Sequence, residues 1–183
     1  MSQYIHGYSE RESQRLLEQS EILEKILHEG TCYEPYSNIL EAGCGVGGQT
    51  VILARRNPDS FITSIDISEE SLQKAKQNCE GQCIVNVRFQ QADIMQLPFP
   101  DNSFDHIFVC FVLEHLSNPL EALIKLKKLL KSNGTITLIE GDHEACIWHP
   151  HTEASELTWK AMIKSQQLLG HDPNIGRKLF PLI

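Results

Sequence analysis

Residues 38–48, NILEAGCGVGG, decide the fold of this 183-residue chain. An apolar segment runs into a glycine-rich turn, and the residues that follow, up to Arg56, have a helical pattern that Asn57-Pro58 ends. Glycine adopts backbone conformations closed to other residues and lets a ligand approach the main chain. The first turn of a helix also leaves N–H groups without intrahelical partners. A strand, a glycine turn and a helix in this order predict a nucleotide-type binding site.

The same alternation of strand and helix continues along the chain. Further strands are predicted at residues 61–67, 87–92, 106–112 and 135–139. Ser68 is placed to cap one intervening helix, and Asn118-Pro119 to start another, which Asn133-Gly134 is expected to close. Strands that alternate with helices form parallel sheets with crossover connections. We therefore expect an α/β fold: a doubly wound, mainly parallel, Rossmann-like sheet with helices on both faces.

The length and composition fit a single globular domain over residues 1–183, with 41% hydrophobic and 22% charged residues. Residues 1–30 are predicted to form an aromatic lead and one helix, which Ser9 and Glu12 begin with a capping-box pattern. Residues 36–141 form the alternating core. Residues 142–183 have a mainly helical pattern, with helices expected at 152–169 and from Asn174 onward.

The charge and the apolar pattern exclude some classes of function. The net charge is −8, which disfavours a nucleic-acid substrate because such proteins bind phosphates with basic surfaces. No apolar run approaches the roughly 20 residues that span a bilayer. The polar N-terminus does not have the pattern of a signal peptide, and the six scattered cysteines are typical of a reduced protein, so we expect a cytoplasmic location. The sequence does not indicate the oligomeric state.

The glycine turn fits two cofactor patterns. Gly43, Gly45 and Gly48 match the GxGxxG of dinucleotide-binding proteins. Gly43, Gly45 and Gly47 after the acidic Glu41 match E-x-G-x-G-x-G instead. A carboxylate beside the turn repels a pyrophosphate and suits a cofactor that carries positive charges. Asp66, at the end of the second strand, would accept hydrogen bonds from ribose hydroxyls in either case.

Five segments in order resemble the class I S-adenosylmethionine-dependent methyltransferases, and in particular the small-molecule branch related to ubiquinone and menaquinone biosynthesis. They are EAGCGVGG (41–48), SIDIS (64–68), ADIMQLPFPDNSFDHI (92–107), FVLEHLSNP (111–119) and LKSNGTITLIE (130–140). The resemblance covers residues 36–141. It implies S-adenosylmethionine as the cofactor and the transfer of its methyl group to a small-molecule acceptor.

The resemblance also implies which residues bind the cofactor. They are Glu41, Gly43, Gly45, Gly47, Asp66, Ile67, Asp93, Ile94, Cys110 and Phe111, together with Tyr4 and Tyr8 from an N-terminal lid. Ile67 is expected to stack on the adenine, Asp93 to bond its amino group, and Cys110 and Phe111 to lie near the methionine portion.

By the same resemblance His115 lies close to the transferable methyl group. Histidine titrates near neutrality, so His115 is the candidate general base that deprotonates or orients the acceptor. A structural histidine that holds the strand-to-helix connection is the alternative. Because the sulfonium is already activated, the protein chiefly has to position the reactants and exclude water.

Residues 142–151 contain three histidines and one cysteine: His143, Cys146, His149 and His151. Their spacings match no standard zinc pattern, so we predict no metal site. This loop is expected either to line the substrate pocket or to be a plain connection.

Two other functions stay open on the sequence. The chain could be a non-catalytic protein with the S-adenosylmethionine-binding fold, or an NAD-dependent oxidoreductase that shares the glycine turn and Asp66. The family pattern normally continues with another strand and a final antiparallel hairpin, and residues 142–183 show neither. The C-terminal strands of the fold are therefore expected to be missing from this sequence.

Overall fold

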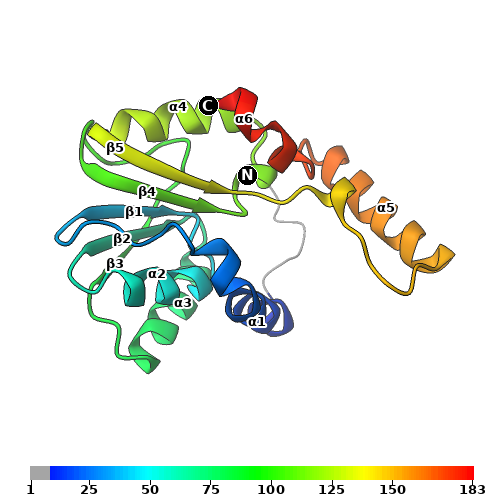
Figure 1. Cartoon of the computed structure of the whole chain (residues 1–183), viewed down its shortest axis with the longest axis horizontal. Coiled ribbons are helices and arrows are strands. Elements are labelled where there is room, and N and C mark those ends of the chain that lie inside the picture. Colours follow the sequence, from blue (N-terminus) through cyan, green and yellow to red (C-terminus); the bar gives the residue numbers. More distant parts are fainter. Residues whose placement is uncertain (1–8) are drawn as a thin grey trace.

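The computed structural model describes residues 9–183 and contains one five-stranded parallel sheet (Figure 1). The strand order is β3-β2-β1-β4-β5, and every neighbouring pair is parallel. The strands are β1 (Asn38–Ala42), β2 (Phe61–Asp66), β3 (Val87–Gln91), β4 (Phe104–Cys110) and β5 (Leu130–Ile139). The predicted α/β fold is confirmed. The strand order reverses between β1 and β4, which is where ligands bind in open sheets of this kind.

Three of the α-helices, α1, α3 and α4, begin at caps that the sequence predicts. The helices are α1 (Glu10–Leu27), α2 (Gly48–Arg56), α3 (Glu69–Gly81), α4 (Pro119–Leu129), α5 (Glu153–Leu168) and α6 (Leu179–Leu182), with short 3-10 turns η1 (Leu113–His115), η2 (His143–Ala145) and η3 (Ile175–Lys178). Ser9 accepts from the Glu12 N–H, Ser68 from Ser71 and Asn118 from Glu121, each at 3.2 Å. Each cap satisfies one of the N–H groups that a helix start leaves unpaired.

Alternate residues of the central strand build the core on both faces of the sheet. Ile39 of β1 packs with Leu53 and Ala54 of α2, whereas the next residue, Leu40, packs with residues of α4 such as Leu126. These side chains are at most 1% exposed. The buried faces hold the strand ends, and therefore the loops after them, in fixed positions.

The start of β5 corrects one sequence expectation. Asn133-Gly134 does not close the preceding helix: α4 ends at Leu129, and these two residues lie inside β5. A register shift separates the pair Phe104–Leu130 from the pair His106–Thr135, so the extra residues form a bulge. Gly134 is needed there because a Cβ would come within 2.8 Å of the Asp105 carbonyl oxygen.

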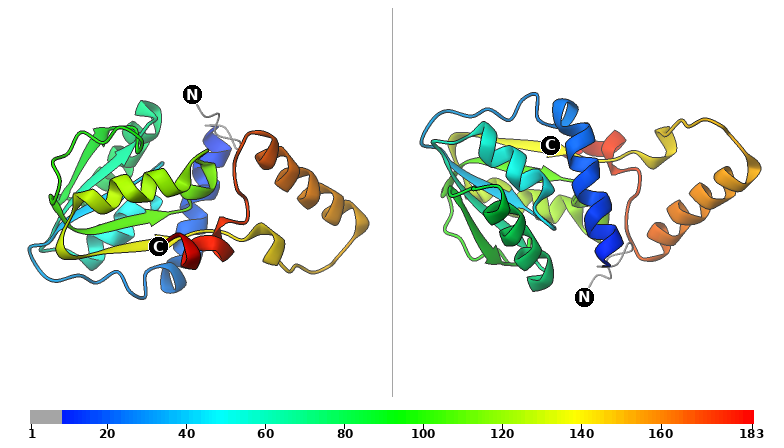
Figure 2. Two further views of the ribbon diagram at one scale, coloured as in Figure 1. Left: turned by 90° about the horizontal axis from the view of Figure 1, so that it is seen from above. Right: turned by 90° about the horizontal axis from the view of Figure 1, so that it is seen from below.

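The C-terminal segment extends beyond the carboxyl ends of the strands. Figures 1 and 2 show α5 standing away from the sheet, with the chain then returning through η3 and α6 toward α4. Ile175 of η3 is 1% exposed and packs in the same core cluster as α4. No helix within residues 9–183 is both long and apolar enough to cross a membrane.

Candidate cofactor-binding cavity

A cavity of about 1000 Å³ lies at the carboxyl ends of the strands. Residues that directly follow each strand line it, and α1 and the C-terminal segment complete its walls. The predicted site residues found in this lining are Gly43, Gly45, Asp66, Ile67, Asp93, Ile94, Cys110, Phe111 and His115. Segments far apart in the sequence thus converge at the switch point of the sheet.

The glycines of the turn have different tasks. Gly43 has φ +80°, and a Cβ there would lie 2.5 Å from Val112 Cγ2. Gly45 has φ +53° with no atom within 4 Å of its Cβ position, so its open side is available to a ligand. Gly47 has φ +85°, and a Cβ there would lie 2.8 Å from the Cα of Ala75 in α3. Gly47 is not among the residues that line the cavity, and its Cβ side packs closely against α3.

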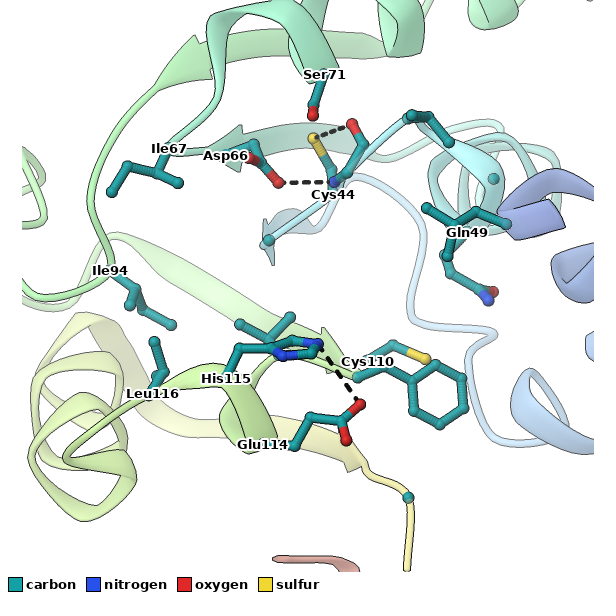
Figure 3. Close-up of a pocket in the computed structure, with 18 of the residues that line it drawn as sticks. Cys44, Gln49, Asp66, Ile67, Ser71, Ile94, Cys110, Glu114, His115 and Leu116 are labelled. Atoms are coloured by element: carbon teal, nitrogen blue, oxygen red, sulfur yellow. Dashed lines mark hydrogen bonds and ion pairs between the residues drawn. The ribbon is translucent and has the colours of Figure 1, made fainter. Parts of the chain in front are cut away.

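Asp66 connects the glycine turn to the end of β2. Its Oδ2 accepts from the Gly45 N–H at 2.8 Å and its Oδ1 from the Ser68 N–H at 2.9 Å. Burial raises the pKa of Asp66, and these backbone donors oppose the rise. Figure 3 shows the carboxylate in the cavity wall beside Cys44. The geometry holds an acceptor next to the open side of Gly45.

Glu41 occupies a different place from the one expected. Its side chain is 2% exposed and does not line the cavity. Oε2 accepts from the hydroxyls of Thr50 at 2.7 Å and Ser64 at 2.6 Å. Burial raises the pKa of Glu41 to about 7, against those two hydrogen bonds. Glu41 therefore joins β1, α2 and β2 beneath the turn, because the strand's period of two turns this side chain into the protein.

Two sides of the cavity differ in chemistry (Figure 3). On one side, Ile67 and Ile94 present apolar surface, and nearby Asp93 accepts from the Met95 N–H at 2.8 Å. On the other side lie Cys110 and Gln49, and Phe111, the next residue after Cys110, also lines the cavity. Burial raises the pKa of the Cys110 thiol well above its ordinary value, which keeps the thiol neutral. Tyr4 and Tyr8, the expected lid residues, lie outside the described part of the chain.

Polar side chains from three elements meet at the wall near η1. Nε2 of His115 lies 3.6 Å from Glu114 Oε1, and Nε2 of His143 lies 3.4 Å from Glu114 Oε2. Burial raises the pKa of Glu114, and the neighbouring His143 and Gln166 oppose the rise. The Trp159 indole N–H donates to the His143 carbonyl at 2.7 Å and fixes η2 against α5. Glu114, His115 and His143 all line the cavity.

The histidine-rich loop contributes less than its composition suggests. Of residues 142–151, only His143 lines the cavity. The Trp148 ring stacks on His151 at 5.3 Å, and its N–H donates to Ser155 Oγ at 2.8 Å. Within residues 9–183, no group of three or more His, Cys, Asp or Glu side chains is arranged to hold a metal ion.

Comparisons with known proteins agree with this geometry. A methyltransferase-domain family profile matches residues 34–177. The chain belongs to the class I methyltransferase family. It is 32% identical over 147 residues to an uncharacterised methyltransferase of Schizosaccharomyces pombe, and the aligned region covers 77% of this chain and 52% of that protein. It is also 34% identical over 102 residues to a demethylmenaquinone methyltransferase of Staphylococcus aureus, over 55% of this chain and 42% of that one.

Solved structures show the same fold. A S-adenosylmethionine-dependent methyltransferase from Aquifex aeolicus superposes with a TM-score of 0.66 at 22% identity, over 87% of this chain and 88% of the other. The [4+2]-cyclase SpnF superposes with a TM-score of 0.54 at 28% identity, over 63% and 41%. This methyltransferase-family chain spans about half the length of the curated relatives it matches.

Several cavity residues were not predicted from the sequence. Leu16, Gln19 and Ser20 come from α1, Gln49 from α2, and Trp159 and Met162 from α5. Amphipathic spacing marks these helices but does not say which side chains meet a cavity formed by other elements. For Gln49, the signal available was its position one residue after the glycine turn.

Proposed function

We propose that this chain binds S-adenosylmethionine in the cavity and transfers the methyl group to a small-molecule acceptor. The observation that carries the proposal is the pairing of Asp66 with the Gly45 N–H at 2.8 Å beside the open side of Gly45. A carboxylate held there is an acceptor for the two ribose hydroxyls, and the glycine leaves space for the ligand backbone.

The residues present fit this cofactor along the length of the cavity. Ile67 and Ile94 would enclose the adenine, with Asp93 as the acceptor for its amino group. Cys110 and Phe111 would border the methionine portion at the end of β4. Among residues 9–183, the Lys and Arg side chains of the lining are both ion-paired, Arg15 with Glu12 at 2.6 Å and Lys74 with Glu70 at 3.0 Å, which does not favour a pyrophosphate.

The bound cofactor would supply an activated methyl group on a sulfonium. The protein then has to bring the acceptor's nucleophile into line and take up its proton. We assign the proton uptake to His115, whose Nε2 lies 3.6 Å from the carboxylate of Glu114. Glu114 stabilises the imidazolium that forms, and the walls of Trp159 and Met162 exclude water from an acceptor bound beside it.

The test is calorimetric titration with S-adenosylhomocysteine and, separately, with NADH. We expect micromolar binding of S-adenosylhomocysteine and none of NADH. Asp66→Ala should weaken the binding of S-adenosylhomocysteine tenfold or more, since each hydrogen bond to a charged group contributes about 1.5–3 kcal/mol. Asp101→Ala, the same change at an exposed aspartate, should leave the affinity unchanged. Binding of NADH alone, or no binding by folded protein, would contradict the proposal.

A further inference from the structure

A buried histidine at the C-terminus of α1 holds the amide of Gln49 in one orientation. His28 is 0% exposed, and its ring stacks on Phe108 with centroids 5.2 Å apart. Its Nε2 lies 2.7 Å from Gln49 Oε1, and its Nδ1 lies 2.9 Å from Thr31 Oγ1. Because the ring is fully buried against Phe108 and has a partner at each nitrogen, it is held in this orientation.

The hydrogen bonds assign the proton positions on this imidazole. The Gln49 carbonyl oxygen can only accept, so Nε2 carries a proton and donates it. Burial lowers the pKa of His28, and the hydrogen bond to Gln49 opposes this fall without cancelling it. In the neutral ring Nδ1 therefore has no proton and accepts from the Thr31 hydroxyl at 2.9 Å, a shorter contact than that of the same hydroxyl with the His28 carbonyl oxygen at 3.2 Å. Both ring nitrogens are satisfied, and the Gln49 oxygen is committed to His28.

The other end of the amide is left as a donor. Gln49 makes no other side-chain hydrogen bond within residues 9–183, and it lines the cavity. Its NH₂ group is thus available to an acceptor inside the cavity. The electrostatic potential at this place also favours an anionic acceptor. Gln49 is in the first turn of α2, where the helix dipole is positive and which contains no acidic side chain.

The position of Gln49 along the cavity indicates which part of the cofactor would lie beside it. Figure 3 shows Gln49 on the side opposite Ile67 and Ile94, with Asp66 and Cys44 between them. If the proposed cofactor lies with its adenine at Ile67 and its ribose at Asp66, its amino-acid portion reaches Gln49. That portion contains one anionic group, a carboxylate.

We infer that Gln49 is a cofactor-binding residue whose NH₂ group, held in place by the His28–Thr31 pair, donates to the carboxylate of S-adenosylmethionine. This inference rests on the proposed function. It makes Gln49 the residue that recognises the amino-acid end of the cofactor, whereas Asp66 recognises the ribose.

The experiment compares two ligands that differ by this end. S-Adenosylhomocysteine has the amino-acid portion, and 5′-methylthioadenosine keeps the adenine and ribose without it. Gln49→Met should weaken the binding of S-adenosylhomocysteine about tenfold, the range for a hydrogen bond to a charged group. Gln49→Glu, which sets a carboxylate against a carboxylate, should weaken it more. Both variants should bind 5′-methylthioadenosine as the wild type does.

The control is Gln73→Met, the same substitution on the exposed face of α3. It should leave both affinities unchanged. Gln49 variants that bind S-adenosylhomocysteine as tightly as the wild type would overturn the inference, and so would an equal loss of both ligands. Wild-type protein that is folded but binds neither ligand would contradict the proposed function itself, and the inference with it. The experiment therefore distinguishes a failure of the inference about Gln49 from a failure of the proposed function.

Discussion

At the scale of single residues, Glu41 shows how a motif residue can serve the site without touching it. Its carboxylate is buried, and its two hydrogen-bond partners are hydroxyls rather than cations. Hydroxyl donors only partly replace the hydration lost on burial, which is why the pKa of Glu41 rises to about 7. The protein therefore buries a group that is half ionised near neutral pH.

This burial predicts a dependence of stability on pH. The unfolded chain releases the Glu41 proton near pH 4.5, whereas the folded chain holds it to about pH 7. Between these values the folded state binds more protons, so the free energy of unfolding falls as the pH rises. In Glu41→Gln, which cannot ionise, the fall from pH 4.5 to pH 8 should be smaller by up to about 3 kcal/mol. Urea denaturation at several pH values measures it.

Glu29→Gln is the matched control, because Glu29 is exposed on the surface after α1. Its pH profile should follow that of the wild type. Glu140, whose pKa burial also raises to about 7, stays in both variants and contributes the same slope. Parallel profiles for the wild type and Glu41→Gln would show that Glu41 does not titrate in this range.

At the scale of elements, the end of β5 fixes the segment that holds the candidate base. Glu140 Oε1 accepts from the N–H groups of Val112 at 2.9 Å and Leu113 at 2.7 Å, and Oε2 from that of Glu114 at 3.4 Å. These donors belong to the start of η1, where no intrahelical partner exists. The carboxylate of Glu140, the residue after β5, thus caps the turn that follows β4 and positions His115.

Removing this cap should loosen η1 before the rest of the sheet. In Glu140→Ala the buried N–H groups of Val112 and Leu113 lose their acceptor, which costs about 1–3 kcal/mol for an unsatisfied donor. We expect their amide hydrogen exchange to accelerate ten- to a hundredfold. Glu140→Gln keeps a carbonyl acceptor, so its exchange rates should lie between those of the wild type and those of Glu140→Ala. The amide of Ile65, in the buried strand β2, is the internal control. Unchanged exchange at Val112 in Glu140→Ala would rule out this capping role.

Local elements were predictable from the sequence, whereas contacts between elements were not. The caps Ser68 and Asn118 act within one turn of their own helix, so their patterns suffice. Glu140 resembles any acidic residue at a strand end, and its partners are 26 to 28 residues away. The His28–Gln49 pair likewise depends on how α1 packs on α2. Such contacts follow from tertiary packing, which no local pattern encodes.

At the scale of the whole molecule, two parts of different character enclose one cavity. The sheet and its crossover helices provide the lining on the side proposed for the cofactor, through Gly45 and Asp66. The segment after β5 adds His143, Trp159 and Met162 to the lining. Arg177 pairs with Asp142 at 2.7 Å and with Glu144 at 3.1 Å, which ties η3 to η2. A ligand in the cavity should therefore contact the C-terminal segment and change the surroundings of its side chains.

The tryptophans report on this arrangement, because both of them, Trp148 and Trp159, lie after β5. Only Trp159 lines the cavity, so binding of S-adenosylhomocysteine should change the intrinsic fluorescence through that ring. Trp148→Phe should keep the ligand-dependent change, and Trp159→Phe should abolish it. Trp159→Phe also removes the hydrogen bond to the His143 carbonyl and should lower the free energy of unfolding by about 1 kcal/mol. A ligand-dependent signal that survives in Trp159→Phe, with calorimetric binding intact, would mean that α5 does not close the cavity around the ligand.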